Sequence, residues 1–170
     1  MEYFDLYTAD RRPLGQKILR GSPLPRGTYH IVVQIMTVNR DGRILLTQRA
    51  QGKSGAGRWE CTGGCAVSGE TSRQAAAREL FEETGIRALP QSLEHIWTLK
   101  GDSMLLDFYA TRQDIGLEDM RLQPAEVSAA KWVSFRRMEE MVRTGQTIAT
   151  VTKWFYACYD SLRSRISAAD

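Results

Sequence analysis

Several features that would set this chain apart from ordinary globular proteins are scarce or missing. Only three of its 170 residues are cysteines, and an odd, small number of thiols argues against a disulfide framework. No apolar run approaches the roughly 20 residues that a membrane-spanning helix needs. The N-terminal segment Met1–Asp5 is acidic and lacks the apolar stretch of a signal peptide. We therefore expect a cytoplasmic protein without a membrane partner.

The excess of positive over negative charge is also small. The sequence has 23 Lys and Arg against 20 Asp and Glu, a net charge of +3, and no run of five like charges. Such a small and scattered excess predicts no nucleic-acid surface, although it is compatible with an anionic small molecule. The length suits one domain. We expect a single domain over residues 1–170, with residues 1–27 as an N-terminal extension packed on it.

The spacing of apolar and turn-forming residues predicts a mixture of strands and helices. The Asp41-Gly42 pair is typical of a hairpin turn between two strands. Strands before and after one central helix, with helices closing the chain, favour one α/β domain with a mixed sheet between helices. The expected strands are two short segments within 3–20, then 30–38, 43–49, 59–67, 93–100, 104–111 and 131–134; the expected helices are 71–84, 135–144 and 147–166.

The helix expected at 71–84 has the clearest local signals. A side-chain oxygen of Thr71 or Ser72 can accept from the free N–H groups of the first turn. Gly85 suits the left-handed residue that often follows a helix. Three glutamates at positions i, i+3 and i+4 then share one face of this helix: Glu79, Glu82 and Glu83.

Local stability does not explain three neighbouring carboxylates. Each like pair costs a few tenths of a kcal/mol, and carboxylates near a helix C-terminus face the unfavourable end of the helix dipole. A bound divalent cation would explain them, because Mg²⁺ prefers carboxylate oxygens as ligands. The alternative is a solvated acidic face without a ligand.

The segment around this helix, from Gly64 to Ile86, reads GCAVSGETSRQAAARELFEETGI. It resembles the Nudix box, the signature of the Nudix hydrolases, at every defined position, and a match of this length is specific. The resemblance implies a Nudix-type α/β/α sandwich with a mixed sheet and a catalytic loop-helix-loop that binds Mg²⁺ or Mn²⁺. It also implies hydrolysis of a diphosphate linkage in a nucleoside diphosphate derivative or another small organic diphosphate.

The resemblance assigns roles to residues of this motif. Glu82 and Glu83 would be metal ligands, and Glu79 would be a ligand or the base that activates water. The backbone carbonyl of Gly63 would complete the metal site.

Further roles follow for residues at the edges of the motif and outside it. Glu70 and Arg78 match an ion pair that braces the loop against the helix. Glu126 lies in a late loop from which the family often supplies another acid, as ligand or base; the alternative is an exposed loop residue. Basic residues in the segment before the motif are candidates to bind substrate phosphates, or else solvated loop charges: Arg49, Lys53 and Arg58.

A second reaction class must be weighed, because residues 2–50 also resemble a branch close to the type 1 isopentenyl diphosphate isomerases. Those enzymes need a catalytic cysteine directly before the box glycine and a metal-binding histidine directly after it. This sequence has Gly63 and Cys65 at those positions. His30 is the one isomerase histidine that remains, and we expect it to be structural. The intact box favours hydrolysis.

A third possibility is a Nudix domain that binds a metabolite without catalysis, but such domains usually lose box glutamates. The sequence leaves the substrate open, because specificity lies outside the box. Trp59, Trp97 and Tyr109 are candidates to stack on a base, or else core residues. Family members are often dimers, so a homodimer is possible.

Overall fold

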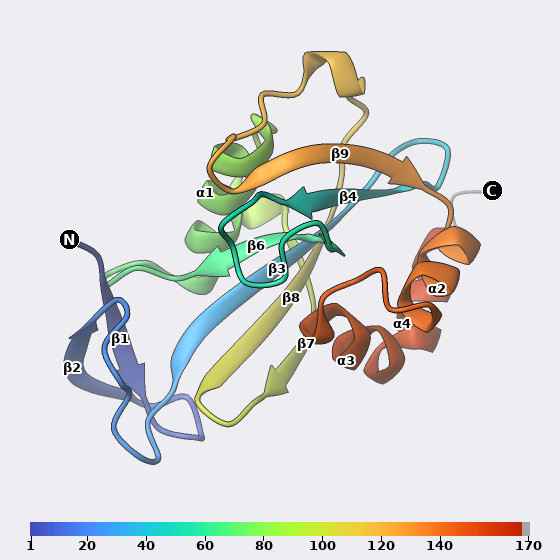
Figure 1. Ribbon diagram of the computed structural model, residues 1–170. Helices are drawn as coiled ribbons and strands as arrows, with labels where there is room; N and C mark the ends of the chain where they lie inside the picture. Colours follow the sequence, from blue (N-terminus) through green and yellow to red (C-terminus); the bar gives the residue numbers. More distant parts are fainter. Residues whose placement is uncertain (168–170) are drawn as a thin grey trace.

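The computed structural model describes residues 1–167, with side chains through residue 163. It is a mixed α/β structure in which a twisted sheet lies between α1 and the C-terminal helices (Figure 1). The fold class expected from the sequence is therefore confirmed. The strands are β1 Tyr3–Tyr7, β2 Pro13–Leu19, β3 His30–Val38, β4 Ile44–Arg49, β5 Trp59–Glu60, β6 Thr62–Cys65, β7 Glu94–Lys100, β8 Met104–Arg112 and β9 Val127–Val133; the helices are α1 Ser72–Thr84, α2 Phe135–Arg143, α3 Ala149–Ala157 and α4 Tyr159–Ser167, with short 3₁₀ turns at Pro90–Ser92 and Leu117–Asp119.

The main sheet has seven strands and is forked at β3. Its order is β5-β4-β3-β8-β7, with β6 paired to β3 and β9 paired to β4. β3 and β8 run parallel, whereas the other pairs are antiparallel. On one side of β3, the strand pairs with β6 through Val32–Ile35 and with β4 at Val38. Strands β6 and β4 diverge between these two pairings, and the candidate site lies in the fork between them.

Alternating residues of the central strands supply two separate cores, as expected when successive side chains point to opposite faces of a sheet. On one face, Ile31, Val33 and Ile35 pack with Leu80 of α1. On the other face, Met36 and Val38 join a core that also contains side chains of all three C-terminal helices: Met138, Met141, Val142, Val151, Trp154, Phe155, Cys158 and Leu162. These two cores give the sandwich its three layers.

Local side-chain contacts set both ends of α1. The Thr71 hydroxyl accepts from the backbone N–H of Gln74 at 3.3 Å, and the Gln74 side chain accepts from the Thr71 N–H, which completes a capping box. Gly85 ends the helix with φ of 77°, in the left-handed region that favours glycine. The glutamate face is thus held in a defined rotation against the sheet.

The N-terminal hairpin of β1 and β2 forms its own two-stranded sheet beside the main one (Figure 1). Tyr7 exchanges backbone hydrogen bonds with Tyr29. The Asp5 carboxylate accepts from the Ser68 hydroxyl at 2.7 Å. Arg11 makes a two-pronged ion pair with the buried Asp107 of β8. These contacts fasten the hairpin to the loop before α1 and to the sheet.

Three boundaries differ from those expected from the sequence. Residues 59–67 form two strands on different neighbours, because β5 pairs with β4 and β6 with β3. The last strand begins at Val127 rather than at residue 131, since residues 127–130 pair with the end of β4. The last expected helix is interrupted at Cys158 and forms α3 and α4 instead. Cys158 and Leu162 are both buried in the core that also contains α3. Among residues 1–167, no helix is long and apolar enough to cross a membrane.

Candidate active site

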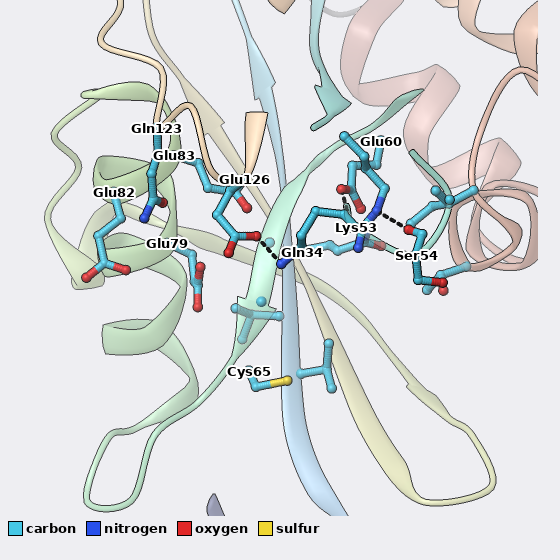
Figure 2. Close-up of a pocket in the computed structure, with 18 of the residues that line it drawn as sticks. Gln34, Lys53, Ser54, Glu60, Cys65, Glu79, Glu82, Glu83, Gln123 and Glu126 are labelled. Carbon is cyan, nitrogen blue, oxygen red and sulfur yellow. Dashed lines mark hydrogen bonds and ion pairs between the residues drawn. The ribbon is translucent and has the colours of Figure 1, made fainter. Parts of the chain in front are cut away.

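A pocket of about 740 Å³ occupies the fork of the sheet beside α1 (Figure 2). One wall is acidic and comes from the glutamate face of α1. The opposite wall is formed by the loop between β4 and β5, which carries basic side chains, and by the start of α3. Strands β3 and β6 form the floor, with Gln34, Gly63, Gly64 and Cys65.

Glu83 is the most deeply buried carboxylate of the acidic wall. The residue is 6% exposed, and its Oε2 atom has no hydrogen-bond partner among the described residues. Burial, together with the nearby Glu60 and Glu79, raises the pKa of Glu83 well above 4.5, although a backbone hydrogen bond from Gly63 opposes the shift. An unpaired buried carboxylate is costly. A cation in the pocket would remove that cost.

Glu79 lies against the glycine floor of the pocket. A Cβ atom added at Gly64 would stand 2.3–2.6 Å from the Glu79 carboxylate, so only glycine leaves room for this side chain. Burial raises the pKa of Glu79, and the neighbouring Arg78 opposes that shift. The Glu79 carboxylate therefore lies close against the backbone of Gly64, and both residues line the pocket.

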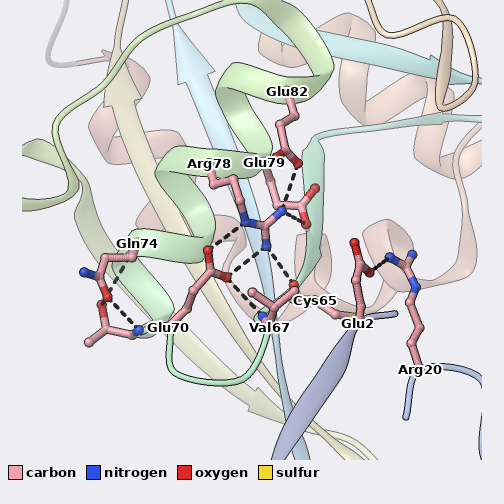
Figure 3. Close-up of polar contacts among 10 residues, drawn as sticks. Glu2, Arg20, Cys65, Val67, Glu70, Gln74, Arg78, Glu79 and Glu82 are labelled. Atoms are coloured by element: carbon pink, nitrogen blue, oxygen red, sulfur yellow. Dashed lines mark hydrogen bonds and ion pairs between the residues drawn. The ribbon is translucent and has the colours of Figure 1, made fainter.

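Arg78 connects the loop before α1 with the glutamate face (Figure 3). Its Nε and Nη2 atoms donate to the two Glu70 oxygens at 2.7 and 3.0 Å, and Nη2 also donates to the Cys65 carbonyl at 3.0 Å. Its Nη1 atom lies 2.9 Å from both Glu79 and Glu82. One guanidinium therefore braces the loop and also neutralises part of the acidic wall.

The donor set of this wall suits a hard divalent cation, since it consists of carboxylates, one of them with an orphaned oxygen. Within residues 1–163, no group of three His, Cys, Asp or Glu side chains stands close enough to hold a metal ion. Arg78 contacts one oxygen each of Glu79 and Glu82, while Glu83 stays buried beside Gly63. Metal binding would therefore require the carboxylates to move toward one another.

The three basic residues singled out in the sequence all line the pocket, and each has partners. Arg49 pairs with Glu60, with Nη1 and Oε1 2.5 Å apart. Lys53 pairs with Glu126 (Figure 2). Arg58 donates to the carbonyl of Gly145 at 2.7 Å, which ties the loop to the segment before α3.

Glu126 reaches the pocket from the connection between β8 and β9. Its carbonyl accepts from the Ala50 N–H at 2.9 Å, so its backbone is anchored to the loop after β4. The same connection is fixed to the end of α1, where the Gln123 N–H donates to the Glu83 carbonyl at 3.2 Å. Glu126 thus lies on the acidic side of the pocket together with Glu79, Glu82 and Glu83 (Figure 2).

Three further charged residues line the pocket that sequence reasoning missed: Glu2, Arg20 and Glu60. Glu60 had one usable signal, a charged residue between Trp59 and Cys61 in a segment expected to be a strand. Glu2 and Arg20 had none. They lie in the N-terminal hairpin and form an ion pair with each other, Arg20 Nη1 to Glu2 Oε2 at 2.5 Å.

A family model for the NUDIX domain matches residues 28–155. The chain belongs to the Nudix family. An uncharacterized Nudix hydrolase of Listeria monocytogenes is 31% identical over 150 residues, which cover 87% of this chain and 89% of the relative. An isopentenyl-diphosphate Delta-isomerase of Aromatoleum aromaticum is 30% identical over 146 residues, covering 82% of this chain and 75% of the relative. A solved structure from Deinococcus radiodurans has the same fold, with a TM-score of 0.78 at 22% identity, covering 93% of this chain and 99% of that one.

This Nudix chain is a pyrophosphohydrolase enzyme. Of the residues relevant to the isomerase comparison, Gly63 and Cys65 line the pocket and His30 does not. His30 stacks on Phe4 with ring centroids 5.0 Å apart, and burial lowers its pKa.

The aromatic residues considered for base stacking do not line the pocket. Tyr109 is buried and donates to the Ser72 hydroxyl at 2.9 Å. Trp97 is exposed on β7, and Trp59 packs against the core below the ammonium group of Lys131.

Proposed function

We propose that this Nudix enzyme hydrolyses the diphosphate linkage of a nucleoside diphosphate derivative or another small organic diphosphate, with Mg²⁺, or Mn²⁺ in its place, held by Glu79, Glu82 and Glu83. The observation that carries the proposal is the buried, unpaired oxygen of Glu83 in a pocket with an acidic wall opposite a basic one. Such a pocket suits a metal on one side and an anionic substrate on the other.

The proposed chemistry divides between the metal and the side chains. When bound, the metal supplies charge stabilisation at the phosphoryl oxygens and lowers the pKa of a bound water. Arg49, Lys53 and Arg58 would bind and orient the phosphates, because in-line displacement at phosphorus depends on positioning. The backbone carbonyl of Gly63, at the floor of the pocket, is the proposed further metal ligand.

Two carboxylates are candidates to accept the proton of the attacking water, Glu79 and Glu126. Glu79 lies beside the glycine floor, where burial raises the pKa of its carboxyl and makes it a better base. Glu126 is paired with Lys53, and an anionic substrate would compete for that lysine. Release of Glu126 by substrate would leave a free carboxylate on the acidic side of the pocket, beside the proposed metal site.

The isomerase alternative has less support. Its catalytic thiol position is occupied by Gly63, and burial raises the pKa of the nearby Cys65 thiol, so that the reactive thiolate is disfavoured. A binding module without catalysis would not need the complete set of glutamates that lines this pocket.

The test is cleavage of a panel of diphosphates in the presence of Mg²⁺, followed by chromatography of the phosphomonoester, pyrophosphate or phosphate products. The panel spans nucleoside di- and triphosphates, ADP-ribose, sugar nucleotides, coenzyme A and isopentenyl diphosphate. Wild type is compared with EDTA-treated enzyme, with Glu83→Gln and with Glu118→Gln, a matched control at an exposed glutamate. Metal-dependent turnover that Glu83→Gln loses and Glu118→Gln keeps supports the proposal. Conversion of isopentenyl diphosphate to its isomer without phosphate release would contradict it.

Two further expectations stay open beside the activity. A homodimer is proposed because family members are often dimers. Light scattering on the assayed protein measures its mass and tests this proposal. The cytoplasmic location expected from the sequence stays a prediction.

A further inference from the structure

We infer that Glu60, a carboxylate to which the sequence motifs assign no role, is a positioning residue that holds Arg49 and the loop between β4 and β5 in the geometry that binds substrate phosphates. The inference rests on the proposed function, because it takes Arg49 as a phosphate ligand. It assigns Glu60 to substrate affinity and not to the metal.

Glu60 is a buried charge at the boundary between the two walls of the pocket. It ends the two-residue strand β5, where it pairs with Thr47 of β4. The residue is 8% exposed, yet it lines the pocket (Figure 2). A carboxylate in this setting needs a partner, since burial of an unpaired charge is strongly unfavourable.

The partner of this carboxylate is Arg49. Glu60 Oε1 accepts from Arg49 Nη1 at 2.5 Å, and Arg49 Nε donates to the Ser54 carbonyl at 2.6 Å. These two contacts use two of the five N–H donors of the guanidinium. The others remain to meet a phosphate, and the planar fork is fixed in one orientation before the substrate arrives.

The same contacts shape the whole loop. The Arg49 backbone closes its base, since the Arg49 N–H donates to the Arg58 carbonyl and the Gly57 N–H donates to the Arg49 carbonyl, both at 3.0 Å. Because Ser54 lies at the far end of the loop, its hydrogen bond to Arg49 connects the tip to the base. Lys53, a second cation that lines the pocket, precedes Ser54 in this loop.

The ion pair between Glu60 and Arg49 is not explained by a contribution to the stability of the fold. A buried ion pair is weak evidence for stability, because apolar side chains of similar size often do as well. A role as a further metal ligand is the main rival, because the charge of Glu60 is felt by Glu83. The two roles differ in their kinetic effect, because loss of a metal ligand would change Mg²⁺ activation, whereas loss of the contact with Arg49 would change substrate affinity.

The test is a kinetic cycle with Glu60→Gln, Arg49→Ala and the double variant, on whichever compound wild type hydrolyses. Glutamine keeps the shape of Glu60 but removes its charge, so its amide oxygen can accept only a weaker, neutral hydrogen bond from Arg49. We expect Glu60→Gln to raise KM about tenfold, since a hydrogen bond to a charged group is worth about a factor of ten in binding. The value of kcat and the Mg²⁺ concentration for half activation should stay within about twofold of wild type.

Arg49→Ala should raise KM at least as much, and the double variant no further, because both changes remove one unit. Glu60→Asp should recover part of the lost affinity, a result that a merely structural role would not give. Glu140→Gln, which breaks the exposed pair with Arg137, is the matched control and should leave KM unchanged. Additive effects in the double variant, or a loss of kcat and of Mg²⁺ activation as in Glu83→Gln, would overturn the inference.

Calorimetric binding of methylenediphosphonate, a diphosphate that cannot be hydrolysed, separates this inference from the proposed function. If no compound is turned over, the proposed function fails, while weaker diphosphonate binding in Glu60→Gln and Arg49→Ala still supports the positioning role. If wild type and both variants bind the diphosphonate equally, or none binds it, the inference is wrong. Melting curves identify any variant that has lost its fold. If Glu60→Gln is unfolded, the comparison of Glu60→Asp with wild type tests the inference instead.

Discussion

Removal of the Arg78 side chain tests how the loop before α1 is held against the helix. In Arg78→Ala, Glu70 loses both hydrogen bonds from the guanidinium, and the Cys65 carbonyl loses its donor. Within the described part of the chain, the side chain of Glu70 then keeps one hydrogen bond, from the Val67 N–H at 3.0 Å. Glu79 and Glu82 lose the cation that lies between them.

The expected loss of stability follows from this geometry. Truncation of one partner of a buried charge pair costs about 3–5 kcal/mol. The Arg78 and Glu70 side chains are 26% and 19% exposed, so solvent weakens the pair and the low end applies. We therefore expect a loss of about 3 kcal/mol in the free energy of unfolding, and a fall in Tm of about 6–12 °C for a chain of this length.

The assay is thermal unfolding in EDTA and again in excess Mg²⁺. If Glu79 and Glu82 hold the metal as proposed, Arg78 competes with it for these carboxylates, and Mg²⁺ should raise the Tm of Arg78→Ala by more than that of wild type. Arg137→Ala, which breaks an exposed pair on α2, is the control and should leave Tm unchanged. A fall in Tm below about 2 °C for Arg78→Ala would refute the bracing role.

Other variants test the burial of the acidic wall and the anchoring of the hairpin. Glu83→Gln should abolish most turnover, yet its Tm in EDTA at neutral pH should equal or exceed that of wild type, because a buried unpaired carboxylate is removed; a lower Tm would contradict this. The raised pKa of Glu83 means that its contribution favours folding below about pH 4.5 and is lost as pH rises toward neutrality. The Tm of metal-free wild type should therefore fall relative to that of Glu83→Gln over this range, and parallel pH profiles would exclude the shift. Gly64→Ala should displace the Glu79 carboxylate and raise the Mg²⁺ concentration needed for half activation; normal activation would show that the close approach is not required. Arg11→Ala should expose the N-terminal hairpin to proteolysis, because the buried Asp107 loses its counter-ion; unchanged digestion would show that other contacts hold it.

The sequence determined the features that depend on neighbours along the chain. The ends of α1 follow from Thr71 and Gly85, and the glutamate face follows from the spacing of residues three and four apart on a helix. The turn at Asp41-Gly42 follows in the same way. The match of Gly64–Ile86 to the Nudix box sufficed to predict the family and the reaction class, because these interactions lie within one short segment.

The tertiary structure alone decided how distant segments meet. The segment 59–67 forms two strands because β5 pairs with β4, whereas β6 pairs with β3. Strands β4 and β6 pair with different parts of the same side of β3, and no local sequence pattern predicts this fork. The pairing of Lys53 with Glu126 joins two loops far apart in the chain. Glu60 met Arg49 only through the pairing of β4 with β5. A buried carboxylate is recognised by its solvent exposure and its counter-ion, and both depend on contacts that form only when the sheet is assembled.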